Sequence, residues 1–296
     1  MIKVSDVTKY FDDYKVLNEI SLHVRKGTIY GLIGPNGAGK TTIINHINGV
    51  LKPLLGEITI GGEKVFENEN IKKKVLNISD DWFYFSTFSI KEMAKFYAKV
   101  YPDFNRERYE AIKEVFKIDE KRQIRKLSKG MKKQVAFWLS LSAMPDVLIL
   151  DEPLDGLDPV MRKQVLNLVI ADVADREMTV LVSSHNLREL EDICDWVGII
   201  HKGKMIIEKP LDDLKGNVHK YQVVFGEKKL EKAENLLHIS NTGNVYNVIL
   251  RGDAEETLSQ LKEFSPVLLE RVSLTLEEVF IYELGGLGYD FKNIIV

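Results

Sequence analysis

The stretch GPNGAGKTT, residues 34–42, decides which fold this sequence can adopt. It matches the phosphate-loop pattern, in which spaced glycines are followed by Lys40 and Thr41. The pattern has structural meaning only between a strand and a helix, and both flanks are present. TIYGLIG, residues 28–34, is apolar enough for a buried strand, and TTIINHINGVL, residues 41–51, repeats its apolar residues with a helical period. The sequence therefore predicts a strand, a phosphate-binding turn and a helix in succession.

The chemistry of this turn is anion binding. Glycines allow backbone N–H groups to turn inward as an anion nest, and the following helix points its positive end at the phosphates. Lys40 adds a cation for the β and γ oxygens, and Thr41 supplies a hydroxyl for magnesium. We expect the cofactor-binding residues of the turn to be Gly34, Asn36, Gly37, Ala38, Gly39, Lys40, Thr41 and Thr42.

A second buried strand ends in two carboxylates. VLILDEPLDGLDP, residues 147–159, places Asp151 and Glu152 at the C-terminal edge of the sheet, where open α/β folds bind ligands. Asp151 is predicted to reach magnesium, and Glu152 to orient and polarise an attacking water. The strand-like VLVSSH delivers His185 to the same edge, where its imidazole can hydrogen-bond a γ-phosphate. The predicted catalytic residues are therefore Glu152, His185 and Lys40.

The order of the elements predicts a doubly wound α/β core. Residues 1–80 read as short strands around one helix, with a hairpin turn at the glycines 61 and 62. Residues 90–123 have a helical pattern and look like an inserted helical subdomain. Residues 147–208 then alternate between buried strands and helices.

A smaller α+β appendage is predicted from about residue 216. Its strand-like segments are YQVVF and YNVILRG, and its helical segments are KLEKAENLL and EETLSQLKEF. We therefore expect a domain at residues 1–215, with the helical subdomain at about 81–134, and an accessory domain at 216–296.

Composition restricts the partners. The chain has 296 residues, of which 45% are hydrophobic, so it can bury a large core and a small one. A net charge of −3 gives no global argument for nucleic acid or an acidic membrane. The single cysteine, Cys194, has apolar neighbours and is predicted to be a core thiol. Because we find neither a secretory signal nor a stretch of about 18 apolar residues, we expect a cytoplasmic chain whose membrane role requires a partner.

Cations crowd around a serine and a glycine in RKLSKGMKKQ, residues 125–134. Ser128 suits a helix N-cap and Gly130 allows close backbone approach, so the helix start forms an anion site. The cations could help to hold a triphosphate, with Lys129 in direct contact, or could be a solvated helix face. The cluster lacks the interleaved aromatic residues of nucleic-acid surfaces, so we expect no nucleic-acid partner.

Together these motifs resemble the ATP-binding cassette (ABC) family of ATPases over about residues 1–210. The family signature Leu-Ser-Gly-Gly-Gln here reads Leu127, Ser128, Lys129, Gly130 and Met131, which matches it at three of five positions. The resemblance implies a phosphate-loop NTPase cassette, with a RecA-like core and antiparallel β and helical subdomains. It also implies a head-to-tail dimer that binds two ATP molecules with Mg²⁺, each between the Ser128 and Gly130 signature of one subunit and the phosphate loop of the other.

Further positions carry over from the family. Phe11 stands where an aromatic ring stacks on adenine, with Tyr10 as the alternative, and Asp158 belongs to the family's cross-dimer loop. The metal ligands implied are Thr41, Asp151 and Asp80, the last of these standing where the family has glutamine. The added charge of Asp80 beside phosphates could make turnover slow or partner-dependent.

The resemblance implies the ATP-hydrolysing subunit of a transporter. It would act with a second ATPase subunit and a transmembrane permease, on the cytoplasmic face of the membrane. The tail SLTLEEVFIYEL resembles cassettes of small bacterial exporters, so we expect export rather than import. The aromatic segment DWFYFSTF, residues 81–88, lies where the family receives a helix of the permease, or it packs the helical core. The alternatives are a soluble non-transport ABC ATPase and a regulatory cassette with weak hydrolysis.

Overall fold

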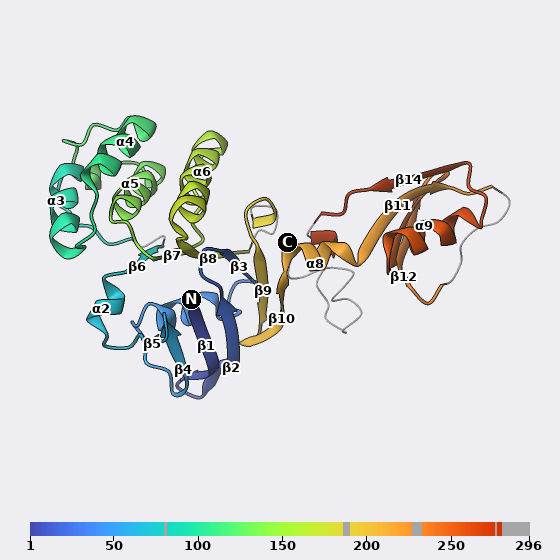
Figure 1. Ribbon diagram of the computed structural model, residues 1–296, viewed down its shortest axis with the longest axis horizontal. Helices are drawn as coiled ribbons and strands as arrows, with labels where there is room; N and C mark the ends of the chain where they lie inside the picture. The colour runs from blue at the N-terminus through green and yellow to red at the C-terminus, as the bar shows by residue number, and fades with distance from the viewer. Residues whose placement is uncertain (80–81, 186–189, 227–232, 276, 280–296) are drawn as a thin grey trace. The chain divides into compact units, whose positions relative to one another are not determined.

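The computed structural model describes residues 1–79, 82–185, 190–226, 233–275 and 277–279 (Figure 1). The chain divides into two compact units. The first comprises Met1–His185 with Ile193–Glu208, and the second comprises Asn186–Asp192 with Lys209–Val296. The assignment of functional domains to residues 1–215 and 216–296 stays a prediction.

An antiparallel sheet opens the first unit, with the strand order β2-β1-β4-β5. Its strands are β1 (Ile2–Phe11), β2 (Tyr14–Val24), β4 (Leu55–Ile60) and β5 (Glu63–Lys64). Gly61 and Gly62 form the two-residue turn between β4 and β5 with φ of 60° and 86°. Because positive φ at both central residues matches the twist of paired strands, glycine is favoured there. The predicted hairpin is confirmed.

The second sheet of this unit has the order β10-β9-β3-β8-β7-β6 (Figure 1). Its strands are β3 (Ile29–Ile33), β6 (Val75–Ile78), β7 (Val147–Asp151), β8 (Thr179–Ser184), β9 (Trp196–His201) and β10 (Lys204–Pro210). β6, β7, β8, β3 and β9 pair in parallel, and every residue of β3, β7 and β8 is buried. Strands buried on both faces are typical of a parallel sheet covered by helices. The predicted doubly wound core is confirmed.

The carboxyl ends of three parallel strands meet at one edge of this sheet. Ile33 of β3 is in register with Ser184 of β8, and Ser183 is in register with Asp151 of β7. After β3 the chain enters α1 (Lys40–Ile47), and α6 (Pro159–Arg176) joins β7 to β8. The site residues that follow the strands are thereby brought together. Cys194 is buried in this unit, and burial raises the pKa of its thiol, as expected for a core residue.

Three helices form a lobe beside the sheet, namely α3 (Ile90–Val100), α4 (Arg106–Phe116) and α5 (Lys129–Ser142) (Figure 1). Two short helices flank them, α2 (Glu69–Lys72) and a 3-10 turn at Ile124–Lys126. α3 begins with a reciprocal cap in which Ser89 and Glu92 bond each other's backbone N–H. The buried ring of Trp138 on α5 stacks on Tyr109 of α4 at 4.7 Å. None of the helices in the described part of the chain is long and apolar enough to cross a membrane.

An ionic cluster around the buried Asp172 joins the helical lobe to α6. Asp172 is 3% exposed and accepts hydrogen bonds from Arg108 of α4 and from Arg176, whose Nη2 lies 3.1 Å from Oδ2. Arg176 also donates to the carbonyl of Pro145 at 2.6 Å. Two partly exposed guanidinium groups, with side chains 27% and 20% exposed, thus share one buried carboxylate, whose removal leaves both of them without their counter-charge.

We expect Asp172→Asn to lower the free energy of unfolding of this unit by about 3 kcal/mol, because two partly buried guanidinium groups lose the buried carboxylate that they share. The midpoint in scanning calorimetry should fall by roughly 6 °C or more. Asp175→Asn is the matched control, because Asp175 is exposed on the same helix. Equal stability of the two variants would contradict this role of the cluster.

The second unit contains the sheet β12-β13-β11-β14. Its elements are α8 (Leu211–Gly216), β11 (Val218–Val224), β12 (Leu236–Thr242), β13 (Val245–Arg251), α9 (Ala254–Lys262) and β14 (Leu268–Val272). The predicted α+β character is confirmed. The helix predicted for KLEKAENLL is wrong at its end, because Leu236 starts β12 and packs against the core of this unit. The beginning of that segment, up to residue 232, lies outside the described residues.

Candidate ATP site

The phosphate loop is a compact turn between β3 and α1. A Cβ on Gly34 would lie 2.3 Å from the carbonyl oxygen of Ile200, so the close approach requires glycine. Gly39 has φ of 109°, a conformation that side chains rarely adopt. The N–H of Ala38 donates to the carbonyl of Pro35 at 3.1 Å. The turn therefore holds its shape by itself and leaves the exposed backbone of Asn36 and Gly37 facing the pocket that the loop lines.

Lys40 lies inside this loop. Its side chain is 6% exposed, and Nζ donates to the carbonyl of Gly34 at 2.6 Å and to that of Pro35 at 3.4 Å. Nζ also lies 3.3 Å from Oε1 of Glu152. The cation that was predicted to bind phosphate is thus held in place by its own loop and neutralised by the carboxylate of Glu152.

Asp151 and Glu152 point to different partners, as expected for consecutive residues at a strand end. Asp151 is 8% exposed, and its Oδ2 accepts a hydrogen bond from Thr41 Oγ1 at 2.9 Å. Its Oδ1 accepts one from Ser183 Oγ at 2.5 Å. Sequence reasoning missed Ser183, which is the register partner of Asp151 in the parallel sheet. Two hydroxyl groups therefore fix the carboxylate beside the start of α1.

Glu152 joins Lys40 to His185. While Oε1 contacts Lys40, Oε2 lies 2.7 Å from Nδ1 of His185, whose side chain is 49% exposed. The backbone of Glu152 is left-handed, with φ of 50°. For a residue with a Cβ this conformation costs about 1 kcal/mol or more, and such strain concentrates at functional sites. The three predicted catalytic residues are brought together at the sheet edge.

The phosphate-loop pocket has a volume of about 390 Å³ and lies over this edge. It is lined by Phe11, Tyr14, Val16, Pro35, Asn36, Gly37, Gly39, Lys40, Thr41, Thr42 and Glu152. Of the two aromatic residues predicted to meet a nucleotide base, Phe11 lines the pocket, and its side chain is 46% exposed. Tyr14 was missed by sequence reasoning. It reaches the pocket because it pairs with Phe11 across the β1–β2 turn.

Three predicted binding residues, Ser128, Gly130 and Asp158, lie away from this pocket, at the starts of two helices. Ser128 caps α5 by accepting the N–H of Met131 at 3.3 Å, which confirms the predicted N-cap. Asp158 caps α6 by accepting the N–H groups of Val160 and Met161, both at 3.0 Å. Asp80, the third predicted metal ligand, lies outside the described residues. One chain therefore presents a phosphate loop and, elsewhere, a separate helix start that suits an anion.

The residues at the sheet edge fit a triphosphate with a divalent cation. Thr41 and Asp151 offer the hydroxyl and carboxylate oxygens that Mg²⁺ prefers, and the glycine cradle with Lys40 suits phosphate oxygens. Within the described part of the chain, no group of three or more His, Cys, Asp or Glu side chains could hold a metal by itself. A metal bound here would therefore complete its coordination with oxygens from the nucleotide and water.

Known proteins identify the family. A family model described as "ABC transporter" matches residues 17–155. The ABC transporter ATP-binding protein YtrB of Bacillus subtilis (strain 168) is 31% identical over 97% of this chain and 99% of its own length. The chain belongs to the ABC transporter ATP-binding proteins. The bacitracin transport ATP-binding protein BcrA of Bacillus licheniformis is 35% identical over 75% of this chain and 73% of its own.

A solved ATP-binding subunit of an ABC transporter has the same fold as this ABC protein. The two match with a TM-score of 0.68 and 28% identity, over 73% of this chain and 92% of the other. The ABC ATP-binding protein is therefore an ATPase whose hydrolysis is coupled to transport. The comparisons support neither the soluble non-transport ABC ATPase nor the regulatory cassette with weak hydrolysis.

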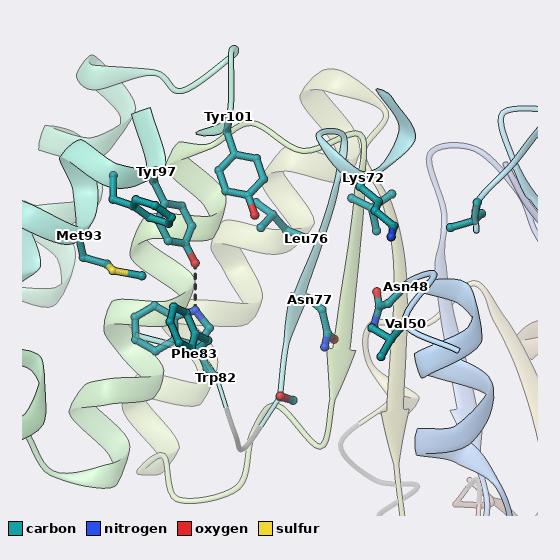
Figure 2. Close-up of a pocket in the computed structure, with 14 residues that line it drawn as sticks. Asn48, Val50, Lys72, Leu76, Asn77, Trp82, Phe83, Met93, Tyr97 and Tyr101 are labelled. Atoms are coloured by element: carbon teal, nitrogen blue, oxygen red, sulfur yellow. Dashed lines mark hydrogen bonds between the residues drawn. The ribbon is translucent and has the colours of Figure 1, made fainter. Parts of the chain in front are cut away.

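This ABC protein has a second hollow, of about 400 Å³, between the helical lobe and β6 (Figure 2). We call it the aromatic groove, and its lining residues include Asn48, Val50, Lys72, Asn77, Trp82, Phe83, Met93, Phe96, Tyr97 and Tyr101. Figure 2 shows Trp82 hydrogen-bonded to Tyr97, with Asn77 and Asn48 on the other side of the hollow. Trp82 Nε1 donates to Tyr97 Oη at 3.0 Å, and burial raises the pKa of Tyr97.

The aromatic segment before α3 divides between core and surface. Phe85 packs edge-on against Phe96 at 5.1 Å and in a tilted arrangement against Phe88 at 4.7 Å, so it belongs to the helical lobe. Phe83 is 65% exposed in the wall of the aromatic groove. An apolar ring left in contact with water at a pocket rim is a feature of interaction sites.

Proposed function

We propose that this chain is the motor subunit of an ABC exporter, working with a second ATPase subunit and a permease at the cytoplasmic face of the membrane. The observation that carries the proposal is the convergence of Lys40, Glu152 and His185 beside the Thr41–Asp151 pair at one sheet edge. Export is favoured because the exporter-like tail of the sequence agrees with a relative named for bacitracin transport. We infer that the cargo of this transporter is a compound of the same class as bacitracin.

Each residue at the site has a proposed role. Lys40 and the amides of residues 34–42 bind phosphate oxygens, Phe11 stacks on adenine, and Thr41 with Asp151 holds Mg²⁺, with Asp80 as a further ligand. Ser128, Gly130 and Asp158 meet the nucleotide on the other ATPase subunit. Bound ATP and Mg²⁺ supply the phosphoanhydride bond and the charge on which these residues act.

The ion pair between Lys40 and Glu152 sets the order of events. Lys40 must exchange the Glu152 carboxylate for phosphate oxygens, which frees Oε1 to accept a proton from the attacking water. His185 stays hydrogen-bonded to Oε2 of Glu152, so the carboxylate stays directed along the sheet edge. Glu152 is thus available as a general base only when Lys40 is bound to another anion.

We place the permease contact at the aromatic groove and the accessory role in residues 216–296. The groove combines an exposed apolar ring, Phe83, with the neutral phenols of Tyr97 and Tyr101, the latter with a pKa raised to about 12 by burial. A short amphipathic helix is the partner that such a groove fits, with apolar anchors against the rings.

We also propose that the nucleotide-binding domain comprises residues 1–215, with its helical subdomain at about 81–134.

Co-purification tests the transport function. We expect the tagged chain, extracted from its native host in mild detergent, to bring down a small membrane protein with several spans, and Phe83→Asp to lose it. The introduced charge should remain solvated and disfavour an apolar docking face, so ATP affinity should not change. Leu54→Asp is the control, because Leu54 is similarly exposed, at 62%, but lies outside the aromatic groove. Recovery of RNA or ribosomes in place of a membrane protein would contradict the transport function.

A further inference from the structure

The first turns of α5 contact the segment that follows β7 in the same chain. Lys133 is 5% exposed, and its Nζ donates to the carbonyl of Glu152 at 2.9 Å and to that of Asp155 at 3.2 Å. A buried ammonium is costly unless hydrogen bonds satisfy it, so its position is well determined. The helix that starts at the signature serine therefore has a charged contact to the backbone of Glu152, the predicted general base.

Lys133 completes the support of a strained residue. The N–H of Glu152 donates to the carbonyl of Ser183 on β8 at 3.2 Å, while the carbonyl of Glu152 accepts from Lys133 on α5. Both peptide groups that flank the left-handed Cα are thus held from opposite elements. Such a conformation persists only where the surroundings determine it. Without Lys133, β8 would supply the remaining hydrogen bonds that the structure gives to the backbone of Glu152 within its described residues.

Two neighbouring contacts join the same elements. A Cβ on Gly130 would lie 2.7 Å from the carbonyl oxygen of Gly156, so glycine is required for α5 to approach the loop. The Lys129 side chain lies along Gly156, within 3.7 Å of the position of a Cβ there. Residues 129, 130 and 133 of α5 therefore rest on residues 152–156, and a displacement of the helix start must move this loop or break these contacts.

We propose that Lys133 is a positioning residue that fixes the Glu152 backbone and connects the signature helix to the general base within one chain. The proposal rests on the role of Glu152 in the proposed function and adds its regulation. When the start of α5 binds a nucleotide on the other subunit, a displacement of this helix is transmitted through Lys133 to the backbone of Glu152. Binding of ATP between the α5 start of one subunit and the phosphate loop of the other then positions Glu152 in the first subunit's own phosphate-loop site.

Kinetics of the full-length protein tests the proposal. We expect Lys133→Met to lower kcat for ATP hydrolysis by roughly tenfold or more with an unchanged KM, because a small misplacement of the base affects only the chemical step. Lys133→Arg, which can still donate to both carbonyls, should restore most of kcat. Lys113→Met is the control, because Lys113 makes its ion pairs with Glu110 and Glu120 in the same lobe.

A double-variant cycle separates positioning from general stabilisation. In single-turnover hydrolysis, Lys133→Met combined with Glu152→Gln should be no slower than Glu152→Gln alone, because both act through one side chain. Additive losses, or a kcat of Lys133→Met equal to that of the unmodified chain, would overturn the proposal. If Lys133→Met does not fold, Lys133→Gln is measured by the same criteria. Failure of the proposed function is distinct, because in that case Glu152→Gln itself would leave turnover unchanged.

Discussion

Replacing Glu152 with glutamine is expected to reduce steady-state ATP hydrolysis by about 10²- to 10⁴-fold, the range that a general base contributes. The amide keeps the size of the side chain but cannot take the proton of the attacking water. ATP should bind at least as tightly, because Lys40 loses the carboxylate that competes for it at 3.3 Å. The variant should therefore retain the nucleotide that it no longer cleaves.

Phosphate release and light scattering together measure this outcome. Turnover of Glu152→Gln should fall, and its solution mass should double only when Mg²⁺ and ATP are both present. The control is Glu177→Gln, which removes an exposed carboxylate paired with Lys26 in the same unit and should hydrolyse ATP normally. Unchanged turnover in Glu152→Gln would remove Glu152 from the mechanism. A persistent monomer would mean that closure needs the permease or a different ATPase subunit.

Replacing Lys40 with alanine is expected to weaken ATP binding by roughly 10- to 100-fold, because charge-assisted hydrogen bonds contribute about 1.5 to 3 kcal/mol. The loss in kcat/KM should be larger, about 10³-fold or more, because the same cation stabilises charge that develops on the transferred phosphoryl group. The loop itself should keep its shape, since Gly34, Gly39 and the Ala38–Pro35 hydrogen bond do not depend on the lysine side chain for their turn.

Titration with a fluorescent ATP analogue and assays of phosphate release check both values. Lys26→Ala is the matched control, because it breaks an ion pair with Glu177 that is largely exposed, whereas the Lys40 ammonium is buried. Exposed pairs contribute little, so the control should behave as the unmodified chain does. Normal ATP affinity in Lys40→Ala would show that this loop is not the phosphate site.

Much of the fold followed from local patterns. Runs of apolar residues predict buried strands such as residues 147–151 and 179–184. The Gly61–Gly62 turn is predicted because glycine tolerates positive φ. The failure at KLEKAENLL has a physical reason. The leucines at 236 and 237 fit a helical period, but pairing of β12 with β13 and packing on the core of that unit override local preference there.

The site was predictable where chemistry is carried by neighbours in sequence. Lys40 and Thr41 follow from the loop pattern, and Asp151 with Glu152 from a strand end, and the structure brings these residues together. Ser183 could not be found, because its bond to Asp151 depends on the register of strands that are distant in sequence. Lys133 was visible only as one cation among several. Which loop it touches is decided by how α5 packs against the segment after β7.

Trp82, whose indole is hydrogen-bonded to Tyr97, is a fluorescent reporter at the proposed permease contact. The chain has three tryptophans, of which Trp138 is fully buried and Trp196 lies under Arg25 at 4.1 Å. Trp82 alone among them lines the aromatic groove. A segment that enters the groove would therefore shift the emission of one fluorophore in three, and docking could be followed in real time without a label.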